Sequence, residues 1–210
     1  MNNQTVAILA FIGFLLAKRT WENVRDPDTL RVLALIRWGF VPKALLSITM
    51  VVAVSLVLWE LHPWFRWSWP SAIGAQSVGN LSMGKVQGAN TWPLKLVGVL
   101  FPLMLLVNVP VFALVEERMF RKGAQRRSWA VNALSCVVFG VVHMLVGVPL
   151  AAAGGLTVGG AIFTRSYLRE VARHKDEETA VYQVAAQHAT YNYLLLGVVM
   201  TAAVAAFWPD

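Results

Sequence analysis

Long apolar stretches with few charges, separated by segments that hold most of the basic residues, limit this chain to very few folds. A helix needs about 20 apolar residues to cross the hydrocarbon core of a bilayer, and six stretches reach or approach that length. Inside a membrane the backbone polar groups must pair with one another, which in runs of this length favours helices. The pattern predicts an all-α, polytopic transmembrane helical bundle. The expected segments are residues 4–17, 43–61, 94–116, 129–147, 149–165 and 181–207.

The composition agrees with this class and excludes others. Only 14% of the residues are charged and 57% are hydrophobic, whereas about 25% are charged in an ordinary soluble domain. The net charge of +7 would suit a nucleic-acid partner, but the positions of the charges follow membrane topology instead. The expected partners are the lipid bilayer and no nucleic acid. The sequence predicts no oligomeric state, and the single cysteine, Cys136, cannot form an internal disulfide.

The basic residues alternate between poor and rich connections. Fifteen of the 18 Lys and Arg residues fall in segments 18–43, 117–128 and 165–180, and three fall in segment 62–95. By the positive-inside rule the rich connections face the cytoplasm and both termini face outside. We therefore expect a multi-pass protein of the cell inner or plasma membrane. Its residues 1–93 would hold the first segments and an outside loop, and residues 94–210 would form a membrane core.

Three short motifs lie in or beside the later apolar segments. They are EExxxR at Glu116, Glu117 and Arg121, FxxxH at Phe139 and His143, and HxxxN at His188 and Asn192. Ionisable groups in membrane segments are costly and usually functional. Two carboxylates, two imidazoles and an amide on three helices are the parts of a hydrolytic site that activates water.

Helical geometry gives the two glutamates different neighbours. Glu117 and Arg121 are four residues apart, so they share a helix face and can neutralise each other. Glu116 points about 100° away around the helix and stays free to act as a general base toward another helix. The alternative is a charged helix end at the membrane surface, which needs no chemistry.

Each histidine motif also places two side chains on one helix face. Phe139 lies one turn before His143, which on an apolar helix could simply be a packed, hydrogen-bonded residue. His188 and Asn192 can both donate hydrogen bonds to one point, as an oxyanion site requires. The alternative for this pair is polar contact between membrane helices.

The three motifs, in this order, resemble those of the CPBP family of CAAX proteases and bacteriocin-processing enzymes, which are intramembrane endopeptidases of the CAAX prenyl protease type 2 kind. The resemblance covers about residues 94–207. It implies that Glu116, helped by His143, activates the water. It also implies that His188 and Asn192 hold the oxyanion, while Glu117, Arg121 and Phe139 support the site.

Metal dependence is a separate question. Glu116, His143 and His188 would be the ligands if a zinc ion were present, because carboxylate and imidazole both bind zinc. The helical HExxH motif is absent, so spacing gives zinc no support and no cofactor is expected. Two departures from the family pattern stand out. The link from Arg165 to Thr179 is long and charged, and simple counting puts His143 near the outer end of its helix while Glu116 and His188 lie near cytoplasmic ends.

The predicted function is an intramembrane endopeptidase that cleaves a membrane-associated or C-terminally anchored protein or peptide, with its active site facing the cytoplasm. Two other functions fit the same chain. A regulator or immunity protein of this fold would bind a partner membrane protein without cutting it. A small proton-coupled transporter would use the same ionisable groups as a relay, although no inverted repeat supports it.

Overall fold

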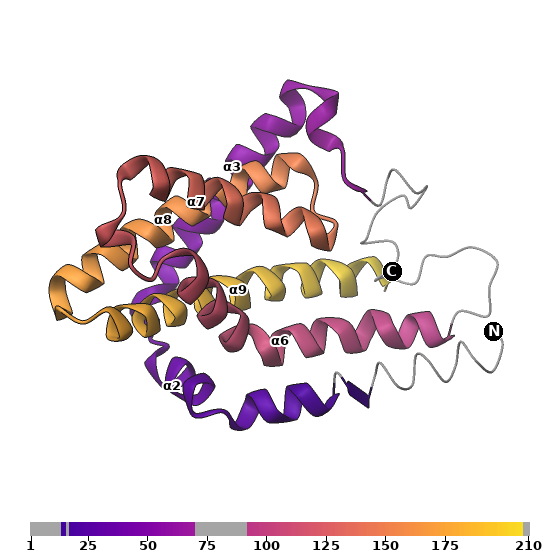
Figure 1. Cartoon of the computed structure of the whole chain (residues 1–210). Helices are drawn as coiled ribbons and strands as arrows, with labels where there is room; N and C mark the ends of the chain where they lie inside the picture. The colour runs from indigo at the N-terminus through magenta and orange to yellow at the C-terminus, as the bar shows by residue number, and fades with distance from the viewer. Residues whose placement is uncertain (1–13, 16, 70–91, 208–210) are drawn as a thin grey trace.

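The computed structural model describes residues 14–15, 17–69 and 92–207 (Figure 1). This part of the chain consists of helices and turns without a strand, which confirms the all-α class. Residues 17–25 are helical. The α-helices that follow are α2 (Pro27–Leu35), α3 (Val41–Leu61), α6 (Trp92–Phe120), α7 (Trp129–Val142), α8 (Leu150–His174) and α9 (Glu177–Phe207). Short 3-10 turns lie at Trp38–Phe40, Pro63–Arg66, Ala124–Arg126 and His143–Val146.

Four of the predicted apolar segments lie within these helices. Residues 43–61 fall in α3, 94–116 in α6 and 181–207 in α9, while 129–147 corresponds to α7 and the 3-10 turn that continues it. The fifth segment, 149–165, corresponds to the first part of α8. Within the described residues, two helical stretches are long and apolar enough to cross a membrane, Trp38–Leu61 and Trp129–Val146. Most of segment 4–17 and residues 70–91 of the outside loop lie outside the described residues.

The predicted charged link from Arg165 to Thr179 is wrong, because α8 continues to His174 and α9 begins at Glu177. Lys175, in the left-handed conformation, ends α8, and its N–H bonds the carbonyl of Val171. The Asp176 carboxylate then accepts a hydrogen bond from the N–H of Thr179 at 2.8 Å. Basic residues here lie on an exposed face of a regular helix, so their charge does not mark a loop.

Helix α8 lies at the centre and contacts α3, α7 and α9. Two glycines allow the close approach. A Cβ at Gly155 would lie 2.2 Å from the Ser55 hydroxyl and 2.5 Å from the Val51 carbonyl on α3. A Cβ at Gly140 on α7 would lie 2.2 Å from the Ala153 carbonyl on α8. Helix α9 packs on α8 and runs beside α6 for much of its length (Figure 1).

The level of α7 relative to α6 explains how the motifs meet. The Ser135 hydroxyl donates to the Phe120 carbonyl at 2.9 Å, and the Phe120 and Phe139 rings contact at 5.3 Å. The last residue of α6 is therefore level with the middle of α7, because the connection runs on past the end of α6 before α7 begins. One turn back along α6 and one turn forward along α7 bring Glu116 to His143, which removes the depth mismatch that simple counting suggests.

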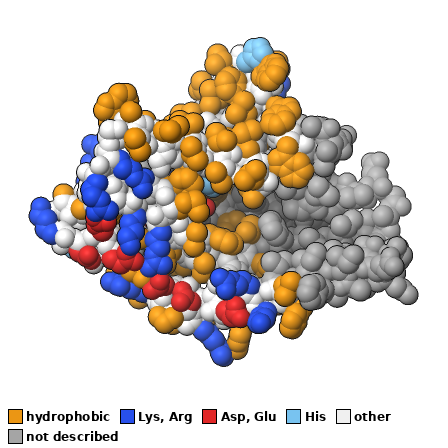
Figure 2. Space-filling model, in the orientation of Figure 1, with side chains coloured by type: hydrophobic (Ala, Val, Ile, Leu, Met, Phe, Trp, Pro, Cys, Tyr) orange, Lys and Arg blue, Asp and Glu red, His pale blue; other side chains and the backbone are white. Residues whose placement is uncertain are grey.

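Charged and apolar side chains occupy different parts of the surface. Figure 2 shows Lys, Arg, Asp and Glu gathered at the end of the molecule where α2, the α6–α7 connection and the α8–α9 turn meet. Apolar side chains cover α3 and α7, where many large ones are exposed. They include Leu45, Leu46, Met50, Leu56, Val57, Leu61, Leu134, Val138, Val141 and Leu145.

Candidate functional site

The EExxxR motif ends α6 with a buried ion pair. The side chains of Glu117 and Arg121 are 0% and 1% exposed, and Arg121 Nη1 lies 3.6 Å from Glu117 Oε1. The Arg121 guanidinium also lies over the Phe139 ring, with Cζ 4.0 Å from its centroid. A charge in such a place must be paired, and the aromatic face adds a cation–π contact.

His188 lies between the two glutamates. Its Nδ1 is 2.8 Å from Glu117 Oε1, and its Nε2 is 3.5 Å from Glu116 Oε2. The imidazole is 3% exposed and stacks on the Phe163 ring at a centroid distance of 4.2 Å. Hydrogen bond and stacking together fix the orientation of the ring, so that Nε2 faces Glu116.

His143, the first residue of the 3-10 turn after α7, lies near the other carboxylate oxygen of Glu116. Its Nδ1 lies 2.7 Å from the Phe139 carbonyl, and its Nε2 lies 3.8 Å from Glu116 Oε1. A carbonyl only accepts hydrogen bonds, so Nδ1 carries a proton, and in the neutral form of the ring Nε2 is bare. The side chains of Glu116 and His143 are 26% and 24% exposed. Of the grouped side chains, these two are the ones that water or a substrate can reach.

Asn192 stands apart from this group. It lies one turn after His188 on α9 and is half-buried. Within the described part of the chain its side chain forms no hydrogen bond with the other candidate residues. The structure therefore brings together Glu116, Glu117, Arg121, Phe139, His143 and His188, and the Asn192 side chain is not hydrogen-bonded to them.

Sequence reasoning missed two groups of residues. Phe163 stacks on His188, yet no motif distinguishes it from other phenylalanines in apolar helices. The second group ties α2 to the end of α6 and the start of α9. Arg118 lies 2.9 Å from Asp28 and 2.8 Å from Glu178, and the Tyr182 hydroxyl bonds to Asp28. Opposite charges far apart in the sequence were the available signal, but nothing in the sequence pairs them.

These contacts also lower the pKa values of two carboxyl groups, those of Asp28 and Glu178. The hydrogen bond from Tyr182 and the Arg118 guanidinium hold the pKa of Asp28 below its ordinary value of 3.8. Hydrogen bonds from Lys122 and Arg118 hold the pKa of Glu178 below its ordinary value of 4.5. Both groups are thus ionised near neutral pH and attract α2, α6 and α9 to one another.

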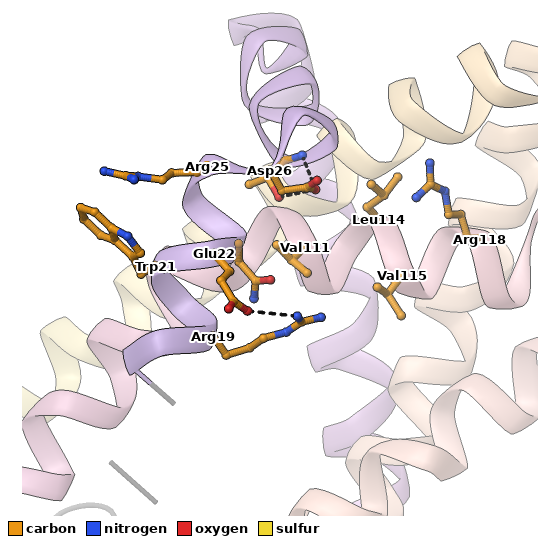
Figure 3. A pocket seen from close by; sticks show the side chains of 11 residues that line it. Arg19, Trp21, Glu22, Arg25, Asp26, Val111, Leu114, Val115 and Arg118 are labelled. Atoms are coloured by element: carbon orange, nitrogen blue, oxygen red, sulfur yellow. Dashed lines mark hydrogen bonds and ion pairs between the residues drawn. The ribbon is translucent and has the colours of Figure 1, made fainter. Parts of the chain in front are cut away.

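A cavity of about 660 Å³ lies on another face of α6. Figure 3 shows Val111, Leu114, Val115 and Arg118 of α6 on one side, and side chains of residues 19–26 on the other. Glu22 and Arg19 pair across its wall at 3.4 Å. No candidate site residue lines this cavity, so it is separate from the group around Glu116.

The described residues contain no group of three His, Cys, Asp or Glu side chains placed to hold a metal ion. His143 and His188 nevertheless each have Nδ1 bound to an acceptor and Nε2 directed at Glu116. Histidines that bind zinc are held in the same way, so this arrangement suits proton transfer and metal binding alike.

No protein-family model matches this chain, and no curated protein or solved structure is similar to it.

Proposed function

We propose that this chain is a polytopic intramembrane endopeptidase that uses Glu116 to activate water. One observation carries the proposal: two imidazoles, from the 3-10 turn after α7 and from α9, direct their Nε2 atoms at one partly exposed carboxylate on α6. The motif resemblance to the CPBP family supports the same reaction. The nearest atoms are 3.5 and 3.8 Å apart, too far for hydrogen bonds, so a water beside Glu116 could contact both histidines.

In the proposed reaction Glu116, with His143, takes a proton from this water as its oxygen attacks the peptide carbonyl carbon. The carbonyl π bond opens to an oxyanion, which accepts hydrogen bonds from His188 Nε2 and the Asn192 amide. When the C–N bond breaks, the proton passes to the leaving amine. The products are a carboxylic acid and an amine, and no other reactant is needed.

The role of His188 sets its charge. Its Nδ1 proton is held by Glu117, so Nε2 can donate to an oxyanion only if the ring is a doubly protonated imidazolium. The group then contains two carboxylates, Glu116 and Glu117, and two cations, Arg121 and His188. Its net charge of zero reduces the cost of holding these groups away from water.

The exposed surface of two apolar helical stretches supports a membrane location. In the most apolar part of each of the two helical stretches, Trp38–Leu61 and Trp129–Val146, only 17% of the residues are buried inside the protein. A core helix of a soluble protein would be mostly buried, whereas a lipid-facing helix keeps its apolar side chains outside. The end rich in Lys and Arg would face the cytoplasm, and the candidate site lies one helical turn from that end of α6.

The substrate follows from this location. A peptide bond that reaches Glu116 must belong to a protein or peptide held at the membrane, such as one with an anchored C-terminus. We expect cleavage of that bond near the cytoplasmic surface. The cleavage experiment identifies the substrate and thereby distinguishes a lipid anchor from a helical one.

Glu116→Gln tests the reaction, because it keeps the size of the side chain and removes the base. Cells with wild-type protein and cells with Glu116→Gln at matched levels are compared by mass spectrometry of peptide termini. We expect at least one terminus only with wild type, and a decrease in its formation of at least about 100-fold in the variant.

Glu60→Gln is the control, because Glu60 is an exposed carboxylate on α3 remote from the motifs. It should leave the termini unchanged. Equal cleavage by Glu116→Gln would refute the mechanism, and identical termini in all cells would favour a binding role. Repeating the comparison with a zinc chelator tests the metal alternative, since loss of cleavage would assign an ion to the site.

A further inference from the structure

A second, smaller cavity of about 280 Å³ lies where α3, α8 and α9 meet. Gln187 of α9 lines it, while the next residue, His188, belongs to the candidate site. Successive residues point about 100° apart around a helix, so α9 separates this cavity from Glu116. Any ligand here has a role other than that of the cleaved peptide.

Three cations surround this cavity without a partner. They are Lys43 on α3, and Arg165 and Arg169 one turn apart on α8. Within the described part of the chain, none of their side chains forms a hydrogen bond or an ion pair. The one carboxylate in the lining, Glu170, lies 3.2 Å from His174. The cavity therefore has an unbalanced positive charge.

The basic residues of the neighbouring connection differ in this respect. Arg118, Lys122 and Arg126 each face an acidic side chain of α2 or α9. Their charges hold helices together, whereas the three cations at the cavity attract nothing within the described residues. An anion from outside the chain is the natural complement to them.

Apolar side chains extend the cavity along α3. Leu46 and Met50 are 63% and 42% exposed, and they follow Lys43 at helical spacing on the same face. A ligand with a phosphate on the cations and a hydrocarbon chain over Leu46 and Met50 would complement both parts. Guanidinium groups bind phosphate oxygens in pairs, which suits Arg165 and Arg169.

We propose that this cavity binds the headgroup of an anionic phospholipid of the cytoplasmic leaflet, with one acyl chain along α3. The inference rests on the membrane location proposed above and not on peptide cleavage. Basic recesses between membrane helices on the cytoplasmic side are a common setting for such headgroups. The lipid would bridge α3 and α8 beside the candidate site.

Native mass spectrometry of the full chain tests the proposal. The protein is purified in detergent with equal amounts of phosphatidylglycerol and phosphatidylcholine, and the lipids that remain bound are counted. Wild type should retain phosphatidylglycerol preferentially. Arg165→Gln/Arg169→Gln should reduce the retained phosphatidylglycerol by about 10- to 30-fold, since each basic residue near a membrane surface contributes to anionic-lipid binding.

Arg173→Gln/Lys175→Gln is the matched control. It removes the same charge from the same end of α8, but neither residue lines the cavity. It should keep the bound lipid within about twofold of wild type. Equal losses in both variants would show diffuse attraction and overturn the proposal, as would the absence of any preference for phosphatidylglycerol.

Two further measurements distinguish binding of a lipid headgroup from binding of a free anion, and lipid binding from peptide cleavage. Inorganic phosphate should leave the lipid bound, and displacement by phosphate alone would mean that the site recognises a free anion. Glu116→Gln should bind phosphatidylglycerol like wild type, because lipid binding requires no catalysis. Failure of the lipid site and failure of the peptidase proposal are therefore distinguishable.

Discussion

Glu117 is the residue on which the geometry of the site depends most. It is fully buried, and it contacts both the Arg121 guanidinium and His188 Nδ1. Through the first contact it balances a charge that the protein interior could not hold alone. Through the second it directs His188 Nε2 at Glu116. A single buried carboxylate thus connects the stability of the α6 end to the orientation of the candidate catalytic group.

Asn192 gives a sharper test of chemistry at the residue scale. Its side chain makes no hydrogen bond within the described part of the chain, so Asn192→Ala should leave thermal stability close to wild type. If its amide holds the oxyanion, kcat should fall by about 100- to 1,000-fold, the usual effect of removing one such donor. KM should change little, because the interaction forms in the transition state.

The measurement is steady-state cleavage of the substrate found with wild type, alongside a melting curve in detergent. Gln183→Ala, one helical turn before Gln187 on α9, serves as a control for loss of an amide outside the motif. A kcat equal to wild type would remove Asn192 from the mechanism. A large loss of stability would instead give it a packing role.

At the scale of helices, close packing of α3 on α8 depends on Gly155. A Cβ there would meet the Val51 backbone carbonyl at 2.5 Å, so Gly155→Ala must push the helices apart. We expect a loss of about 1–3 kcal/mol in the free energy of unfolding, as for other overpacked sites. Gly197→Ala on α9 is the control, since nothing lies within 4 Å of its added Cβ. Unfolding in detergent with increasing denaturant would show the difference, and equal midpoints would contradict the packing argument.

The docking of α2 gives a prediction on pH. Asp28 and Glu178 have pKa values below the ordinary 3.8 and 4.5. Their ionised forms therefore stabilise the fold above those values, and the contribution is lost as the pH falls through the lowered values. The melting temperature of wild type should fall more steeply than that of Asp28→Asn/Glu178→Gln between about pH 5 and pH 3. Parallel curves would mean that the ion pairs contribute nothing.

The helices were more predictable from the sequence than their relative levels. Apolar runs indicated α3, α6, α7, α9 and the first part of α8, because hydropathy follows burial in lipid or protein. The predicted end of the fifth segment, at residue 165, was wrong. Arg165, Arg169 and Arg173 lie along an exposed helix face, and charge alone cannot distinguish such a face from a loop. The meeting of Glu116 with His143 depends on the path of residues 121–128, which no pattern within the segments encodes. The residues of the site were predictable as types, but their distances were not.

At the scale of the whole molecule, the charged end defines an orientation that labelling can test. Arg173 lies at that end, and Trp64 is 74% exposed in the 3-10 turn after α3. Trp64→Cys should react with a membrane-impermeant thiol reagent added to intact cells, and Arg173→Cys only after permeabilisation. Wild type provides the background, because its Cys136 is buried. Labelling of both variants from outside would refute the predicted topology.

The distance from Glu116 to the end of α6 also sets how deep a substrate bond must lie to be cleaved. Glu116 precedes the last residue of that helix, Phe120, by four positions, and a helix rises 1.5 Å per residue, so the carboxylate sits about 6 Å along the axis from the helix end. In the proposed orientation a scissile bond needs to descend only that far from the aqueous boundary. Substrates would then be selected by how far their susceptible bond stands from their anchor, and a few residues inserted between bond and anchor would move it out of reach.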